Sequence, residues 1–315
     1  MARVAVVGSF NVDHVWRVAA LPQAGATLGG DYASGPGGKG FNQAMAARRA
    51  GAEACFVCAL GGDLGAQLAR ALCTADGIDL RDAESAAPTG TAGIFVDASG
   101  RNCIVVGAGA NATLDAGFVA ASLEALGAVS VVLAQLESPA DAIARALAHG
   151  RARGATTILN PAPANATASG ALLELADILT PNETEFAALL GRHVGERIEA
   201  DAVSSLDQGR LHALCRQLGH GSSVVVTMGA SGCFVSHPDG NLRGDEAACY
   251  RISADAANAV DTTGAGDAFN GALAASLALR PRQPFAEHIR FATRYAGLST
   301  ECEGAALAMP RLPTA

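Results

Sequence analysis

The sequence lacks the features of a protein that binds nucleic acid or crosses a membrane. Lys and Arg number 22 against 30 Asp and Glu, the net charge is −8, and no basic run occurs. We therefore expect neither a nucleic-acid partner nor attachment to an anionic membrane. No apolar run is long enough to span a bilayer. The first residues lead into an apolar segment at Val4 without a secretory signal, so we expect the cytoplasm.

The cysteines lack the grouping that would build a metal site. Eight are scattered along the chain, and only Cys55 and Cys58 have C-x-x-C spacing. They lie in an apolar segment, 54–60, that is typical of a strand, where side chains three positions apart point to opposite faces. No second pair completes a zinc site. We predict that all eight cysteines are small buried hydrophobic residues.

Aromatic residues are also scarce, at 4%, whereas half of the 315 residues are apolar. Ala, Val, Leu and Gly dominate, which predicts a core of small side chains between helices and a sheet. Apolar β-branched segments alternate with helical patterns, and no repeat or linker divides the chain. This order favours one α/β domain, residues 1–315, with a doubly wound, mostly parallel sheet flanked by helices.

Two stretches depart from that alternation. Residues about 12–36 mix apolar residues with glycine and proline, which is typical of short strands and turns. Residues about 88–107 form an expected hairpin with a turn at 97–100. We interpret both as β excursions from the main sheet.

One late motif has the composition of an anion-binding helix start. Gly264, Ala265 and Gly266 precede an expected helix from Asp267 to Leu279. Unpaired N–H groups and the helix dipole bind phosphate at such a point. A carboxylate there can take a proton from a hydroxyl while the turn holds a transferring phosphoryl group. The alternative is that Asp267 is only a capping residue.

A second glycine turn lies at residues 37–40. It is not a Walker A loop, because Gly40 stands where a Ser or Thr would bind magnesium. Lys39 and Asn42 lie three residues apart at the start of an expected helix and point to the same place. The glycines allow a small polar ligand to approach closely.

Polar residues also follow several buried strands, where open α/β sheets bind ligands. Asn11 and Asp13 follow segment 3–8, and Glu137 follows segment 129–134. Asn11 and Asp13 could instead form an Asx turn. Asn182 and Glu185 follow segment 177–180, but their spacing equally fits a capping box.

These motifs together resemble the ribokinase-type (PfkB) carbohydrate kinases. The resemblance covers nearly the whole chain, and its motifs occur in order: Gly8-Ser9-x-Asn11-x-Asp13-His14, Gly37-Gly38-Lys39-Gly40-x-Asn42-Gln43-Ala44, Gln135-Leu136-Glu137-Ser138-Pro139, Asn160-Pro161-Ala162-Pro163, Thr180-Pro181-Asn182-Glu183-Thr184-Glu185 and Asp261-Thr262-Thr263-Gly264-Ala265-Gly266-Asp267. The resemblance implies ATP-dependent phosphorylation of D-ribose at O5, with a ribokinase-like fold whose two β excursions form a lid. It also implies a homodimer in which the lids of two subunits pack together.

The resemblance assigns roles residue by residue. Asp267 would be the base, and Gly264, Ala265 and Gly266 the anion hole. The sugar hydroxyls would be bound by Asn11, Asp13, Gly38, Lys39, Asn42, Glu137 and Asp267. ATP would contact Asn182, Thr227, Gly229 and Thr293, with Mg²⁺ held indirectly by Glu185. A K⁺ activator would be held, partly by backbone carbonyls, by Asp261, Thr263, Ser299, Cys302, Gly304 and Ala308. Oxygen-only ligation suits this hard cation.

The residues themselves favour a sugar, because hydroxyls need both donors and acceptors. A sugar phosphate would need more cations than Lys39. Phe10 and Phe41 are bulkier than expected beside the sugar motifs, and Thr293 stands where members of the family often carry Asn near the adenine. The alternatives are a kinase of the same fold that acts on a nucleoside, stacked on Phe10 or Phe41, or on another sugar. A sugar-binding sensor without catalysis is a further alternative. Asp261 could also bind only its own turn.

Overall fold

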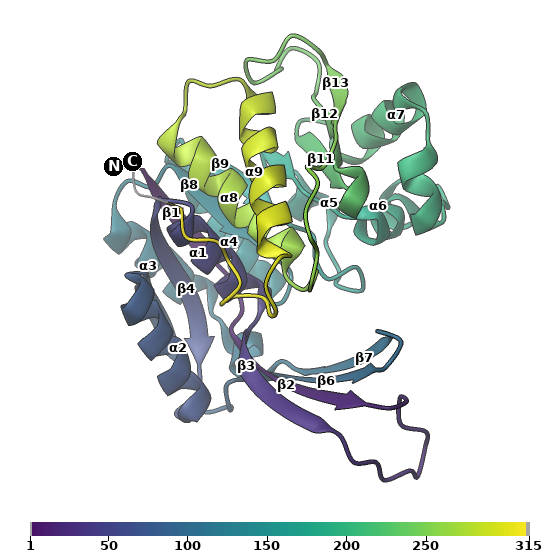
Figure 1. Cartoon of the computed structure of the whole chain (residues 1–315). Coiled ribbons are helices and arrows are strands. Elements are labelled where there is room, and N and C mark those ends of the chain that lie inside the picture. Colours follow the sequence, from purple (N-terminus) through teal and green to yellow (C-terminus); the bar gives the residue numbers. More distant parts are fainter. Residues whose placement is uncertain (1, 313–315) are drawn as a thin grey trace.

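The computed structural model describes residues 2–312 and contains two β-sheets (Figure 1). The strands are β1 (Arg3–Val7), β2 (Asn11–Val18), β3 (Asp31–Gly37), β4 (Glu53–Leu60), β5 (Asp79–Glu84), β6 (Gly90–Asp97), β7 (Asn102–Gly107), β8 (Val131–Ala134), β9 (Thr156–Leu159), β10 (Ile178–Leu179), β11 (Ser223–Thr227), β12 (Cys233–Ser236) and β13 (Cys249–Ile252). The helices are α1 (Lys39–Arg49), α2 (Leu64–Asp76), α3 (Ala116–Leu126), α4 (Ala140–Ala152), α5 (Gly170–Leu173), α6 (Glu183–Leu189), α7 (Gln208–Leu218), α8 (Ala265–Leu279) and α9 (Phe285–Ser299).

The main sheet has nine strands in the order β13-β12-β11-β10-β9-β8-β1-β4-β5. Its strands are parallel from β11 to β5, whereas β12 and β13 run antiparallel at one edge. The chain starts in the middle at β1, moves outward to β4 and β5, and returns to β8 on the other side. The strand order thus reverses between β1 and β8, which is where open α/β sheets bind ligands. The predicted fold class is confirmed.

Helices cover both faces of this sheet because its strands are apolar on both sides. Val4 and Val6 of β1 belong to a core cluster with α1, α2, α8 and α9, whereas Ala5 and Val7 belong to a second cluster with α3 to α7. The two cysteines of β4 divide in the same way, as the strand periodicity predicted. The prediction that every cysteine is buried was wrong: Cys103 and Cys302 are exposed and Cys249 is half-buried.

The small sheet has the order β3-β2-β6-β7 and projects from the main body as an arm (Figure 1). Its strands lie where the two β excursions were predicted. β2 pairs in parallel with β6, and β3 and β7 flank them antiparallel. Because β2 begins four residues after β1 ends, the base of the arm lies beside the switch point of the main sheet.

Helices α1 and α8 bring their N-termini to that same edge. They pack closely through Gly271, where an added Cβ would lie 2.4 Å from the Gln43 carbonyl oxygen and 2.5 Å from the Ala46 Cβ. Gly38 precedes α1 with φ of 88°, and Gly264 precedes α8 with φ of 76°. Both values lie in the left-handed region, which favours glycine at the two predicted turns.

Sequence reasoning missed strand β5. Four of its six residues are charged, Asp79, Arg81, Asp82 and Glu84, as is common in a strand at the edge of a sheet. Between α6 and α7 the chain forms a π turn (Leu190–Val194) and a 3₁₀ turn (Ala200–Ser205). None of the helices within residues 2–312 has the length and apolar character needed to cross a bilayer.

Candidate active site

Asp267 lies in the first turn of α8 and is nearly fully buried. Both of its carboxylate oxygens accept amide hydrogen bonds: Oδ2 from Asn42 Nδ2 and Oδ1 from Gln43 Nε2, each at 2.9 Å. Burial raises the pKa of Asp267, while the charge of Lys39 and the two amide donors act against that rise. A buried carboxylate with a raised pKa at a helix N-terminus has the properties of a general base.

The turn before α8 has the geometry of an anion site, with one qualification. The Ala265 N–H donates to the Thr262 carbonyl oxygen at 3.2 Å, so it is partly engaged. The other first-turn N–H groups have no intrahelical acceptor. Gly264 also lies against Ala305, whose Cβ would be 2.8 Å from an added Cβ. The C-terminal loop therefore supports the turn from behind.

Lys39, the first residue of α1, is the cation of the site. Burial alone would lower its pKa, but three carboxylates outweigh this effect and hold the pKa above its usual value. They are Asp267, Glu137 and Glu185. The ammonium is therefore charged at neutral pH and lies within the field of the predicted base.

Glu137 follows β8 and does two things. Its Oε2 accepts hydrogen bonds from the Ser9 hydroxyl at 2.6 Å and from the Lys39 backbone N–H at 3.0 Å. The second bond satisfies a free donor at the start of α1, which has no side-chain cap of its own. Glu137 thus anchors the helix that carries Lys39, in addition to its expected place at the sugar.

Asp13 lies on β2 and faces the same cluster. Burial, with the charges of Glu137 and Asp267, raises the pKa of Asp13 to about 7. An added Cβ at Gly37 would lie 2.1 Å from Asp13 Oδ2, so only glycine fits on the neighbouring strand. At neutral pH the Asp13 carboxyl exchanges its proton readily, and it can donate to a hydroxyl or accept from one.

Asn11 and Asn42 present opposite ends of their side-chain amides to a ligand. Asn111, in a 3₁₀ turn (Gly109–Thr113), exchanges two bonds with the Phe10 backbone and donates to Asn11 Oδ1 at 2.8 Å. The Asn11 Nδ2 group is therefore the end left to donate to a ligand. Asn42 uses its Nδ2 on Asp267, and its buried Oδ1 has no partner within the described residues. A ligand hydroxyl can donate to that oxygen.

Phe10 and Phe41 lie behind the site and do not line it. Both are fully buried, with ring centroids 5.1 Å apart and edge to face. Phe41 also contacts Phe56 in the core. Neither ring is available to stack on a nucleobase, so the nucleoside alternative loses the stacking partner that the sequence offered for it.

Asn182 and Glu185 form the capping box that was the alternative explanation of their spacing. Glu185 N–H donates to Asn182 Oδ1 at 2.8 Å, and Asn182 N–H donates to Glu185 Oε2 at 2.9 Å. Glu185 is nevertheless buried near Lys39, and burial raises its pKa. Asn182 bridges to Thr227 at the end of β11, and Gly229 follows with φ of 49°.

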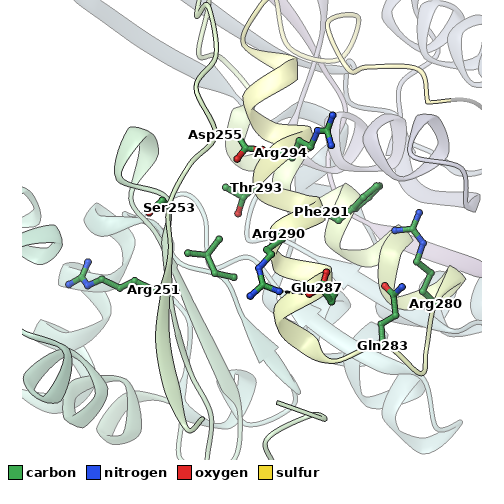
Figure 2. Close-up of a pocket in the computed structure, with 11 residues that line it drawn as sticks. Arg251, Ser253, Asp255, Arg280, Gln283, Glu287, Arg290, Phe291, Thr293 and Arg294 are labelled. Carbon is green, nitrogen blue, oxygen red and sulfur yellow. Dashed lines mark hydrogen bonds and ion pairs between the residues drawn. The ribbon is translucent and has the colours of Figure 1, made fainter. Parts of the chain in front are cut away.

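Thr293 continues this row on helix α9. Thr227 pairs with Cys233 of β12, and Cys233 Sγ lies 3.8 Å from Thr293 Oγ1. Thr293 lines a pocket of about 630 Å³ between β13 and α9, and Figure 2 shows its side chain facing that space. The pocket is rich in arginine and does not include the sugar-site residues; its walls hold Arg251, Arg280, Arg290 and Arg294.

The predicted cation segments lie next to each other. Asp261 Oδ2 accepts from the Gly304 N–H at 2.9 Å, and the Thr300 carbonyl accepts from two N–H groups of the turn. Asp261 Oδ1 meanwhile accepts from the N–H and hydroxyl of Thr263, as the local-turn alternative predicted. The carboxylate therefore joins the turn to the C-terminal loop. Of the remaining predicted positions, Cys302 is exposed, Ser299 is buried and Ala308 is half-buried.

Sequence reasoning missed several residues that hold the site together. Ser9 and Gln43 lay inside quoted motifs without an assigned role, and Asn111 was visible only as part of an Asn-x-Thr triplet. Asn160 follows β9 and accepts from Gln43. Polar residues after buried strands were the available signal. Which of them contact each other depends on helix and lid placement. Within residues 2–312 no group of three or more His, Cys, Asp or Glu is arranged to hold a metal ion.

Comparison with known proteins agrees with this geometry. The model of the pfkB family carbohydrate kinases matches residues 1–312. The ribokinase of Haemophilus influenzae is 36% identical over 310 residues, which cover 97% of this chain and 94% of the relative. The structure of ribokinase from Giardia lamblia has a TM-score of 0.85 at 29% identity and covers 98% of this chain and 96% of its own. The structure of Arabidopsis thaliana ribokinase complexed with ribose and ATP has a TM-score of 0.80 at 27% identity, with 98% and 95% covered. The chain belongs to the pfkB family of carbohydrate kinases.

Proposed function

We propose that this protein transfers the terminal phosphoryl group of ATP to O5 of D-ribose, giving ribose 5-phosphate. The observation that carries this proposal is Asp267: a buried carboxylate at a helix N-terminus, held by two amides beside a charged lysine. The relatives named as ribokinases, one of them complexed with ribose and ATP, support the choice of substrates.

The mechanism follows from the positions of these groups. Asp267 accepts the proton of the sugar hydroxyl as that oxygen attacks phosphorus. The free N–H groups at the start of α8, with the helix dipole and Lys39, stabilise the negative charge of the transferring group. Most of the rate enhancement comes from positioning and charge stabilisation, as is general for phosphoryl transfer.

The arrangement suits a small neutral polyol. Asn11 Nδ2 and Lys39 donate, Asn42 Oδ1 and Glu137 accept, and Asp13 can do either. Lys39 is the one cation in this cluster among the described residues, which disfavours a sugar that already carries a phosphate. The fully buried Phe10 and Phe41 disfavour a nucleoside.

The residues proposed to contact the nucleotide lie at and after the ends of neighbouring strands and on α9. Asn182 pairs with Thr227, Gly229 follows two residues later, and Thr293 opens onto the arginine-lined pocket (Figure 2). Mg²⁺, when bound with the nucleotide, neutralises phosphate charge. The buried Glu185 carboxylate fits an indirect role in holding it, because Asn182 occupies only its Oε2.

We also propose K⁺ as an activator. The observation that fits it is that two segments with oxygen ligands meet at Asp261. Asp261 lies just before residues 264–266, the phosphate turn. Ser299, Cys302, Gly304 and Ala308 would contribute backbone carbonyls. With ATP as a Tris salt at constant ionic strength, K⁺ should raise the rate of the wild type and not that of Asp261→Ala. Equal wild-type rates with and without K⁺ would remove the site.

The arm sheet is proposed to act as a lid and as the contact of a homodimer. Trp16 stacks on Phe95 with centroids 5.2 Å apart, and β7 exposes Ile104, Val105 and Val106 by 52–65%. Adjacent apolar side chains with such exposure usually mark an interface, and pairing of two identical arms closes it symmetrically. Sedimentation at micromolar concentration should give a dimer, and Val105→Asp should give a monomer. A wild-type monomer would refute this contact.

The test of the proposed function is ATP consumption with a panel of pentoses, hexoses and nucleosides. D-Ribose should have the highest kcat/KM. A higher kcat/KM for a hexose or nucleoside would contradict the choice of substrate, and binding without turnover would indicate a sensor.

A further inference from the structure

A buried chain of amides runs behind Asp267. Gln135 Nε2 donates to Gln43 Oε1 at 2.6 Å, and Gln43 Nε2 donates to Asn160 Oδ1 at 3.1 Å and to Asp267 Oδ1 at 2.9 Å. Asn160 Nδ2 in turn donates to the Thr180 carbonyl oxygen at 2.9 Å. Gln43 and Gln135 are completely buried and Asn160 is 6% exposed. Buried amides of this kind are costly unless their partners are satisfied.

The direction of every bond in this chain is fixed by one backbone group. The Thr180 carbonyl can only accept, so Asn160 must turn its Nδ2 toward it and its Oδ1 toward Gln43. Gln43 must then present Nε2 to that oxygen and, with the same group, to Asp267. The opposite orientation of Gln43 would place its Oε1 against two acceptor oxygens.

The same series of hydrogen bonds also reaches the phosphate turn. The Thr180 hydroxyl donates to Asn270 Oδ1 at 2.6 Å, and Asn270 Nδ2 donates to the Gly266 carbonyl oxygen at 2.8 Å. Gly266 directly precedes Asp267, so the bonds form a closed ring. One network therefore fixes both the carboxylate and the turn in front of it.

We propose that Gln43 is a positioning residue that holds Asp267 ionised and oriented for proton transfer, an inference that rests on the proposed function. Gln43 occupies one carboxylate oxygen and Asn42 the other, so the carboxylate cannot rotate. Both donors favour the ionised form. The nearby charged groups are Lys39 on α1, Asp13 on β2, Glu137 after β8 and Glu185 on α6. Of these groups only Lys39 favours the ionised form of Asp267, so the amides of Asn42 and Gln43 provide the remaining stabilisation.

The test is the pH dependence of kcat at saturating sugar and ATP. Gln43→Met keeps the volume and removes the donor to Asp267. Because a hydrogen bond to a charged group is worth about one pKa unit or more, the acidic limb of the profile should move up by about one pH unit. The KM for the sugar should change less than about threefold, since Asp267, the proposed sugar contact that Gln43 touches, keeps its hydrogen bond from Asn42.

A second substitution of Gln43 and a control variant complete the test. Gln43→Asn keeps an amide, but its side chain is too short to reach both Asn160 and Asp267. The acidic limb of its pH profile should therefore also move up. This variant replaces Gln43→Met in the test if the Met variant folds poorly. Gln67→Met, on the exposed face of α2, should leave the profile unchanged. A lower kcat at every pH with the acidic limb at its wild-type position would show that Gln43 only fills space. Absence of sugar phosphorylation in the wild type would instead overturn the proposed function.

Discussion

At the scale of single residues, the site places three carboxylates around Lys39 and a fourth, Asp13, near two of them. Glu185 and Asp267 are buried, Asp13 and Glu137 are half-buried, and burial raises the pKa of Asp13, Glu185 and Asp267. Such crowding disfavours the ionised forms and is typical of functional sites. This cost agrees with the roles proposed for these groups at the sugar, the phosphates and the start of α1.

Asp13 gives a prediction in which function and stability change in opposite directions. Its pKa is raised to about 7 from 3.8, so the folded state binds the proton more tightly than the unfolded state. The wild type therefore loses stability as the pH rises from about 4 through 7. Asp13→Asn should melt at a higher temperature than the wild type at pH 8, with the difference shrinking toward pH 4.

The same substitution should lower kcat/KM for the sugar about tenfold or more, because a neutral amide replaces the carboxylate and is a weaker acceptor for a ligand hydroxyl. Thermal unfolding without ligands and steady-state kinetics measure the two effects separately. A melting difference that does not depend on pH would contradict the assigned titration.

At the scale of elements, the sequence predicted most helices and strands because their apolar periodicity is strong. The strand β5 was missed because its charged residues form ion pairs at the sheet edge, such as Arg70 with Asp82. Cys103 was misjudged because it lies on β7, an exposed strand of the arm. Local patterns could not show either outcome, since both depend on where an element lies in the sheet.

The base of the arm contacts Asn11, one of the residues proposed to bind the sugar. Asn111, directly after the β6–β7 hairpin, fixes Asn11 and the Phe10 backbone. Gly90 of β6 lies against this pair, and an added Cβ there would be 2.2 Å from Asn111 Nδ2 and 2.3 Å from Asn11 Oδ1. The base of the arm thus packs directly against the Asn11 amide.

Asn111→Leu should therefore raise the KM for the sugar about tenfold, the equivalent of one lost hydrogen bond near 1.4 kcal/mol, while kcat falls much less. Asn102→Leu, at the exposed start of β7, is the matched control and should leave KM unchanged. An unchanged KM in Asn111→Leu would show that Asn11 needs no support from the arm.

At the scale of the whole molecule, one buried ion pair joins α1, α2 and the C-terminal segment. Arg49 contacts Asp76 through Nε at 2.9 Å and Nη2 at 3.1 Å, and its Nη1 donates to the carbonyls of Leu307 and Met309. Arg311 adds a second cation to Asp76 at 2.8 Å. This clamp fixes the segment whose Ala305 supports Gly264 in the phosphate turn.

Arg49→Met should lower the free energy of unfolding by about 3–5 kcal/mol, because it leaves a buried carboxylate partly unpaired. Burial alone would raise the pKa of Asp76, but Arg49 and Arg311 outweigh it and hold the pKa below its usual value. The pair therefore stabilises the protein above the unfolded pKa near 4, and this contribution is lost as the pH falls through the lower folded pKa.

Denaturant unfolding at pH 7 and at acid pH measures this effect. Arg70→Met, which breaks the exposed pair with Asp82, is the control and should cost less than about 1 kcal/mol. Equal costs for the two variants would show that the clamp contributes no more than a surface pair.

The sequence predicted which residues gather at the site better than it predicted which of them contact each other. Asp267, Lys39 and Glu137 could be predicted because glycine turns and strand ends have local signatures. The partners Gln43, Asn111 and Asn160 could not, because each meets its partner only when helices, arm and sheet are in place. Whether Phe10 and Phe41 pack behind the site or shape it could not be predicted for the same reason.

The proposed reaction is tested most directly by phosphorus NMR of the product that the wild type and Asp267→Asn form from D-ribose and ATP. The wild type should give ribose 5-phosphate. Asp267→Asn keeps the shape but cannot accept the proton, so kcat should fall by about two to four orders of magnitude while the Kd for ribose stays within about threefold. Phosphorylation at another hydroxyl, or a variant with substantial residual turnover, would contradict the account.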